Sequence, residues 1–154
     1  MPGIHGKPPP VSLCSANQLS GWSLQAINGL PQEEVAKILQ KSLVFLSFGY
    51  PEGFGLPLAE AAACGCYLIG YSGLGGSEIF QLASNHHSGC EIAYGNWLGF
   101  LQACSEFSNR LDNSQDELIN GLLQNSQTIR SIYSPQKMLH SVKIALQRWE
   151  KHLL

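Results

Sequence analysis

Two glutamates flank a glycine-rich turn in the stretch PEGFGLPLAEAAACG, which spans residues 51–65. Glu52 and Glu60 stand eight positions apart, and Gly53 and Gly55 leave little bulk in the turn. Glycines let a ligand approach the main chain closely, and the free N–H groups at a helix start attract phosphate. Carboxylates accept hydrogen bonds from sugar hydroxyls. This combination predicts a site for a nucleotide sugar.

The two acids also have a purely structural interpretation. Glu60 would then interact with the helix dipole in a first turn, and Glu52 would be a solvated loop acid. A second glycine-rich turn, GLGGSE, covers residues 73–78, and there Ser72 and Ser77 either contact a phosphate or cap a helix. From the residues alone both alternatives stay open. The candidate phosphate or sugar loop comprises Ser72, Gly73, Gly75 and Gly76.

Both turns need elements that hold them at the end of a sheet. Residues 42–48 (SLVFLSF) and 66–72 (CYLIGYS) are short apolar runs, typical of parallel strands that are buried on both faces. Between them, Pro57 suits the start of a helix that good helix formers continue until Gly65. The βαβ unit over residues 43–72 predicts an α/β, Rossmann-like parallel sheet with flanking helices. Ligands bind such sheets beyond the carboxyl ends of the strands.

Further elements are expected on both sides of this unit. Residues 22–27 (WSLQAI) alternate apolar with polar and predict a short strand. Residues 29–42 predict a helix of about three turns with Pro31 at its first position. A helix is expected to start in residues 77–84. A helical C-terminal tail is predicted over residues 95–111, 115–133 and 134–154, the last with Ser134 as cap and Pro135 in first position.

Length and composition indicate one globular domain. The chain has 154 residues, of which 44% are hydrophobic and 13% charged, enough apolar material for a core. Residues 1–20, with prolines at positions 2, 8, 9 and 10, lack a periodic apolar pattern and predict a flexible N-terminal segment. The organised domain is expected over residues 21–154.

The net charge and the cysteine pattern argue against several classes of protein and of binding site. A formal net charge of −2 provides no broad basic surface for nucleic acid. Five cysteines without a CxxC pair argue against a disulfide framework and against a zinc site. No signal peptide is visible, and no run reaches the roughly 18 apolar residues of a membrane span. These features predict a cytoplasmic protein without a transmembrane segment.

Other candidate groups have simpler interpretations. A dinucleotide fingerprint would need glycine where the chain has Glu78. His86 and His87 lie in a polar stretch, typical of a surface loop. Two groups are expected to pack in the core: the helical face of Trp97, Phe100, Leu101 and Phe107, and the thiols of Cys64 and Cys66.

Residues 45–78 closely resemble the sugar-nucleotide-binding motif of the family-4 (group 1) retaining glycosyltransferases of GT-B fold. The motif has an apolar strand, E-G-F-G-L-P, a second Glu after seven intervening residues, A-x-G, another apolar strand and G-G-x-E, and the chain matches each part. The resemblance is strong over about residues 22–85, and the helical remainder is compatible with the end of such a C-terminal domain.

The resemblance implies a role for each motif residue. Glu52 would be the catalytic residue that contacts the donor sugar and stabilises positive charge around the anomeric carbon. Glu60 would bind the ribose hydroxyls of the donor. No metal or other cofactor is expected, and the donor is a nucleotide diphosphate sugar. Sugar hydroxyls and the distal phosphate would be held by the backbone of Gly53, Phe54, Gly55 and Leu56.

The chain departs from the family pattern at its N-terminal side. A full enzyme of this kind has an N-terminal acceptor domain, and its C-terminal domain opens with an Arg/Lys pair that clamps the diphosphate. Only Lys7 precedes Lys37, and its Pro-rich setting does not resemble this clamp. We therefore expect a partial donor-binding domain that needs the missing N-terminal domain for transfer to an unknown acceptor.

Two other functions remain open from the sequence. One is a non-catalytic interaction or oligomerisation module, in which an unpaired sheet edge pairs with another copy of the chain. The other is a redox or nucleotide-binding domain of the ordinary Rossmann type.

Overall fold

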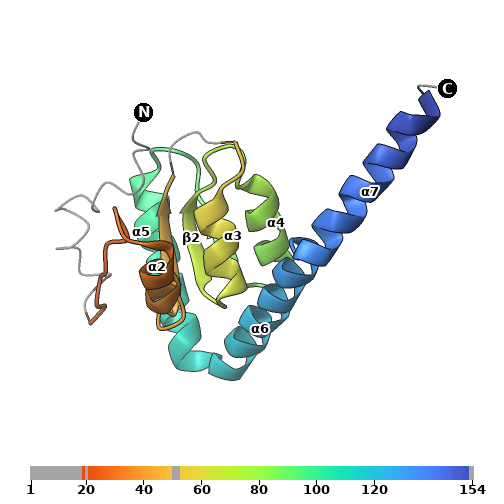
Figure 1. Ribbon diagram of the computed structural model, residues 1–154. Helices are drawn as coiled ribbons and strands as arrows, with labels where there is room; N and C mark the ends of the chain where they lie inside the picture. Colours follow the sequence, from red (N-terminus) through yellow and green to blue (C-terminus); the bar gives the residue numbers. More distant parts are fainter. Residues whose placement is uncertain (1–18, 20, 50–52, 153–154) are drawn as a thin grey trace.

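The computed structural model describes residues 19, 21–49 and 53–152 (Figure 1). Within these residues, helices flank a parallel three-stranded sheet and the chain ends in helices. This confirms the predicted α/β, Rossmann-like fold class. In chain order the elements are α2 (Gln32–Leu39), β1 (Val44–Phe48), α3 (Leu56–Ala63), β2 (Tyr67–Tyr71), α4 (Ser77–Asn85), β3 (Gly89–Glu91), α5 (Trp97–Asn113), α6 (Gln115–Ile132) and α7 (Pro135–His152).

The sheet has the order β1-β2-β3, and both strand pairs are parallel. The helix α3 connects β1 to β2, so the βαβ unit predicted over residues 43–72 is present. All of β2 is buried, as expected for a central strand that is covered on both faces. Within the described residues β1 pairs on one side only and is mostly half-buried. The expectation of full burial is therefore confirmed for β2 and wrong for β1.

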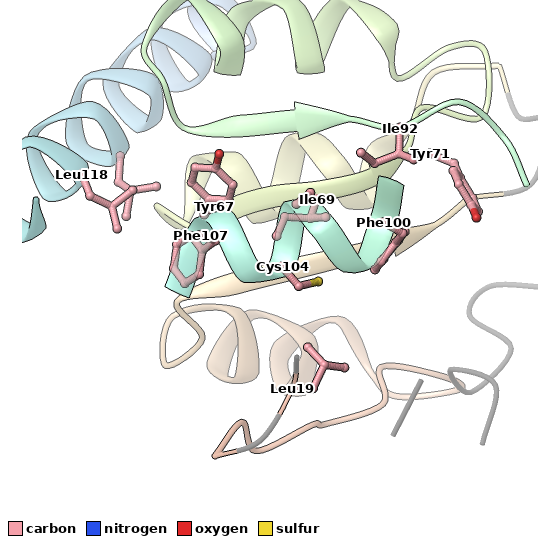
Figure 2. Packing of buried hydrophobic residues seen from close by; sticks show 11 residues of the cluster. Leu19, Tyr67, Ile69, Tyr71, Ile92, Phe100, Cys104, Phe107 and Leu118 are labelled. Atoms are coloured by element: carbon pink, nitrogen blue, oxygen red, sulfur yellow. The ribbon is translucent and has the colours of Figure 1, made fainter. Parts of the chain in front are cut away.

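The side chains of β2 alternate between two cores, one on each face of the sheet. Ile69 and Tyr71 point toward α5 and belong to the core that contains Phe100 and Phe107 (Figure 2). Leu68 faces the opposite way and packs in the core formed with α3 and α4. The predicted core positions of the two phenylalanines are confirmed.

The sequence does not predict β3, which has three residues. Its residues pair with positions 68–70 of β2. Gly89 and Glu91 are poor strand formers, and a segment this short shows no alternation of apolar and polar residues. The neighbouring strand β2, through its hydrogen bonds, makes this segment extended.

Residues 22–27, predicted as a strand, do not form one. Trp22 packs in the core on the α5 side, with its ring edge-on to Phe107 at 5.7 Å between centroids. Ile27 packs in the core on the opposite face, against α3 and α4. The segment therefore passes around the β1 edge of the sheet. It does not pair along β1 because it changes faces within a few residues.

α2 is shorter than predicted. It has eight residues, which is about two turns instead of three. Pro31 is its N-cap, one position before the expected first helical residue. The Pro31 carbonyl accepts hydrogen bonds from the amides of Glu34 and Val35, at 3.0 and 3.1 Å.

The helix α6 holds the C-terminal end of α3. Ser126 Oγ and Arg130 Nε both donate to the carbonyl oxygen of Ala63, at 2.7 and 2.8 Å. These bonds satisfy a carbonyl near the helix end, where intrahelical partners are missing. The helices α5, α6 and α7 confirm the predicted helical tail. Ser134 Oγ accepts a bond from the Lys137 amide at 3.2 Å, as expected of the cap of α7.

The last helix, α7, projects from the body of the domain and has little contact with it (Figure 1). Hydrophobic side chains recur along it at helical spacing and lie on one face. Each is at least 49% exposed, and together they form what we call the α7 stripe: Met138, Leu139, Val142, Leu146 and Trp149. No helix in the described part of the chain, α7 included, combines the length and apolar character needed to span a bilayer.

Candidate functional site

Three loops leave the carboxyl edge of the sheet, after β1, β2 and β3, and lead toward α3, α4 and α5. Parallel sheets bind ligands at this edge. We call residues 53–55 the first glycine loop and residues 73–76 the second glycine loop. Both correspond to the glycine-rich turns predicted from the sequence.

The first glycine loop leads directly into α3. Gly55 is the N-cap, and its φ of 78° is left-handed, a conformation that glycine adopts without strain. Its carbonyl accepts bonds from the amides of Leu58 and Ala59, at 3.0 and 3.2 Å. Pro57 lies in the first turn, as predicted. Gly53 is exposed, and a Cβ placed on it would meet no atom of the described residues within 4 Å. The side-chain position of Gly53 is therefore open on the side away from the described residues.

The second glycine loop packs its main chain directly on the first. A Cβ at Gly75 would collide with the backbone of Gly53 and Phe54. A Cβ at Gly55 would lie 2.9 Å from the Cα of Gly76. Glycine is required where two backbones approach this closely. The missing side chains of Gly55 and Gly75 therefore let the two loops pack together, that of Gly76 leaves room for Leu58 and the Ser72 carbonyl, and that of Gly53 faces no other described residue.

Of the two predicted acids, the structure describes Glu60. It lies one turn after Leu56, on the side of α3 that is turned away from the buried residues Leu58 and Ala59. Its side chain is half-buried. Glu52 lies outside the described residues. The roles of both acids stay predictions.

A polar network joins the second glycine loop to β3. Ser77 Oγ lies 3.0 Å from Glu91 Oε1 and 3.1 Å from Ser72 Oγ. An ionised carboxylate only accepts, so the Ser77 proton goes to Glu91 and Ser72 supplies the proton between the hydroxyls. Ser77 does not cap α4, because the N-cap is Gly76. The sequence did not indicate Glu91, since β3 was not predicted.

An aromatic cluster lies beside this network. The ring of Tyr71 contacts those of Tyr94 and Trp97, with centroids 5.2 and 6.0 Å apart. Tyr94 is 71% exposed. Trp97 is 44% exposed, so its predicted place in the core is wrong. Trp97 is the first residue of α5 and lies at the carboxyl edge of the sheet, where the core ends. A cavity of about 160 Å³ lies between residues 71–74 and residues 91–94.

A wider groove of about 540 Å³ lies along α4 and β3. It shares Ser77 and Glu91 with the polar network, and its other lining residues are on the same two elements or next to them. None of its lining residues belongs to the first glycine loop. The groove is therefore separate from the first glycine loop, and of the residues considered for phosphate binding it includes Ser77.

The end of α6 contacts the first glycine loop. The rings of Phe54 and Tyr133 meet edge-on, with centroids 5.4 Å apart and an interplanar angle of 76°. Burial raises the pKa of Tyr133, and the neighbouring carboxylate of Glu78 raises it further. Tyr133 is the C-cap of α6, so this contact links the C-terminal helices to the loop.

Two side chains, Cys66 and His86, have structural partners. Burial, with a smaller contribution from Cys64, raises the pKa of Cys66 to about 12. Its Sγ donates to the carbonyl of Leu39 at 3.3 Å, so Cys66 is the inert core thiol that was predicted. His86 Nε2 lies 3.1 Å from Thr128 Oγ1. In the described part of the chain, no group of three or more His, Cys, Asp or Glu side chains is placed to hold a metal ion.

Comparison with known proteins gives the family. A model of the family described as Glycosyl transferases group 1 matches residues 16–97, more than half of the chain. The chain belongs to this family. The part of the chain that matches the model of the group 1 glycosyltransferases contains both glycine loops and Glu60. Nearly all of α5, and all of α6 and α7, lie beyond it.

A relative agrees with this assignment to the group 1 glycosyltransferases. It is the Alpha-1,6-glucosyltransferase of Actinobacillus pleuropneumoniae serotype 7 (strain AP76), with 33% identity over 95 residues. The aligned part is 62% of this chain and 26% of the relative, so the chain spans about a quarter of the relative's length. No solved structure matches the chain significantly.

Proposed function

We propose that this chain is the donor-binding part of a group 1 glycosyltransferase of GT-B fold. In this proposal residues 21–154 belong to a C-terminal domain whose first glycine loop binds a nucleotide diphosphate sugar. The transfer retains the configuration at the anomeric carbon and needs an N-terminal acceptor domain. The chain alone therefore binds the donor without transferring sugar. The name of the relative indicates glucose as the donor sugar.

The geometry of the first glycine loop is the observation that supports this proposal most. Gly53 is exposed, its side-chain position meets no other described residue, and Gly55 is the N-cap of α3. Free amides at a helix start stabilise the negative charge of a diphosphate, and an exposed backbone without side chains leaves room for it. The second glycine loop holds the first in place by direct backbone contact.

The roles of the acids follow from the resemblance. Glu60, on the outward side of α3, accepts hydrogen bonds from the ribose hydroxyls. Glu52 stabilises the positive charge that develops at the anomeric carbon during transfer. In the second loop, Gly75 and Gly76 serve loop packing. Ser72 and Gly73 are then the residues of this candidate loop that remain for contact with a sugar.

Titration of the full chain with UDP, GDP, ADP and their glucose conjugates tests this function by isothermal calorimetry. We expect one of the three nucleotides to bind. Its glucose conjugate should bind with at least the affinity of the free nucleotide diphosphate. Glu60→Gln should weaken binding, because the neutral amide is a poorer acceptor for ribose hydroxyls. Glu117→Gln, at an exposed position in the first turn of α6, is the matched control and should bind like the unchanged chain.

Two results would contradict the proposal. The first is the absence of binding by all three nucleotides and their conjugates in a chain that is shown to be folded by circular dichroism. The second is unchanged affinity in Glu60→Gln, which would remove the ribose role while leaving donor binding by the loop intact.

A second candidate function is an interaction module derived from such a domain. The exposed α7 stripe favours it, because large apolar patches on soluble domains mark interaction sites. Light scattering after size exclusion separates the two functions. A stable dimer that binds no nucleotide would favour the interaction module, and a monomer that binds a nucleotide sugar would favour the donor domain.

A further inference from the structure

We propose that the cavity between residues 71–74 and residues 91–94 binds one sugar ring of the acceptor. We call it the Tyr94 cavity. This site depends on the proposed function and adds a place for the second substrate. Tyr94 forms its aromatic wall, and Ser72 and Glu91 provide polar groups.

The size of the Tyr94 cavity selects the ligand class. Pockets that enclose a whole drug-sized ligand measure about 300 to 1,000 Å³. The Tyr94 cavity measures about 160 Å³, which leaves room for a single ring and not for a nucleotide diphosphate. A ligand held here therefore places one ring in the cavity and extends outside it, as a terminal sugar of a larger acceptor does.

Tyr94 has the properties of a stacking surface. Its side chain is 71% exposed, although its ring is held by contact with Tyr71 at 5.2 Å. Tyr71 is itself packed edge-on against Phe100, so the support behind Tyr94 is part of the core. The face of an aromatic ring is electron-rich, and the C–H face of a pyranose is apolar with partial positive charge. The two surfaces complement each other.

The polar groups of the cavity suit sugar hydroxyls. Glu91 Oε1 accepts from Ser77, and its carboxylate has further lone pairs for a ligand. The hydroxyl of Tyr71, which also lines the cavity, is buried and has no hydrogen-bond partner among the described residues. Burial raises the pKa of this hydroxyl, and the nearby Gly95 amide opposes that rise without the geometry of a hydrogen bond. A buried hydroxyl without a partner is unfavourable, so a ligand hydroxyl that reaches it stabilises the site.

The cavity is placed beside the proposed donor loop but is separate from it. Gly75 and Gly76 pack on the first glycine loop, whereas Ser72 and Gly73 line the cavity. The start of the second glycine loop, with the preceding Ser72, therefore lines the Tyr94 cavity. The end of the same loop packs on the first glycine loop, where the donor is proposed to bind. Transfer between two bound substrates requires such proximity.

Chemical-shift mapping of the full, ¹⁵N-labelled chain tests the site with methyl α-D-glucopyranoside as the probe. We expect the probe to shift the amide signals of residues 72–74 and 91–95 and to leave those of residues 53–60 unchanged. The nucleotide glucose conjugate that binds in the calorimetric titration should shift residues 53–60 instead. Both ligands together should produce both sets of shifts.

Variants of the aromatic wall sharpen the test. Tyr94→Ala should weaken glucoside binding about fivefold to tenfold, the usual effect of losing an aromatic contact, while Tyr94→Phe keeps it. Leu98→Ala is the matched control, because Leu98 is 68% exposed and lies outside the cavity lining. Equal melting temperatures of the variants show that the fold is kept.

Three results would overturn the inference. The first is that the glucoside causes no shifts at residues 91–95. The second is an equal loss of glucoside binding in Leu98→Ala and Tyr94→Ala. The third is displacement of the glucoside by the nucleotide glucose but not by the free nucleotide. The last would assign the cavity to the donor sugar. The proposed function fails separately, if no nucleotide shifts residues 53–60 while the glucoside still shifts residues 91–95.

Discussion

The two glycine loops lie at the same edge of the sheet and look alike in sequence, yet their glycines serve different purposes. At Gly53 the position of the missing side chain is open in the part of the chain that the structure describes, and at Gly75 it leaves room for the backbone of the other loop. Glycine in a turn therefore indicates that something approaches the main chain closely. Whether this is a ligand or another part of the protein depends on contacts between segments about twenty residues apart.

The strongest test of this difference is Gly75→Ala. The new Cβ collides with backbone atoms of Gly53 and Phe54, which cannot rotate away as a side chain can. We expect a loss of about 2–4 kcal/mol in the free energy of unfolding, measured by urea denaturation with circular dichroism. A loss below about 1 kcal/mol would show that the loops separate easily.

Gly55→Ala should have the next largest effect. A left-handed φ of 78° costs an alanine about 1–2 kcal/mol, and the Cβ must also displace Gly76, whose Cα lies at 2.9 Å. Gly55→Asn is the informative companion, since asparagine tolerates this conformation better. Equal free energies of unfolding for the two variants would mean that glycine is required at position 55 by the close contact with Gly76. The left-handed backbone conformation would then not be the cause.

Tyr133→Ala tests the support of the first loop from the C-terminal side. It removes the edge-on contact with Phe54 and should cost about 1 kcal/mol in the free energy of unfolding. We also expect weaker nucleotide binding, because Phe54 belongs to the proposed donor loop. Tyr133→Phe keeps the ring and serves as the control. Equal stability of the alanine variant and the unchanged chain would mean that the contact does not hold the loop.

Gly53→Ala should have the smallest effect on stability, within about 0.5 kcal/mol, because its Cβ meets none of the described residues. Under the proposed function, the same methyl group lies where the donor approaches, so nucleotide affinity should fall several-fold. Calorimetry and thermal unfolding on one sample measure both. Unchanged affinity would mean that the donor does not contact this residue, and a large loss of stability would remove the contrast with Gly75.

Much of the fold could be predicted from local sequence because its central part follows local rules. The apolar runs around β1 and β2, the proline and glycine that bound α3, and the helical periodicity of the tail each identify an element without knowledge of its neighbours. Residues 22–27 mislead because their alternating pattern fits a strand, while tertiary packing takes Trp22 and Ile27 to opposite faces of the sheet.

The candidate site could be predicted only in part. The first glycine loop and Glu60 belong to one continuous motif, so spacing alone brings them together. Glu91 and Tyr94 come from a segment with no such motif, and β2 and the second glycine loop bring them to the edge of the sheet. The Tyr94 cavity consists of two segments about twenty residues apart, and no local pattern relates them.

The α7 stripe has a consequence for the helix that carries it. An isolated helix of 18 residues is only marginally stable in water, because most helical stability in proteins comes from packing of the apolar face. With its apolar face in solvent, α7 should exchange its amide hydrogens far faster than α5, which is anchored in the core. Slow exchange along α7 would then report that another surface has covered it.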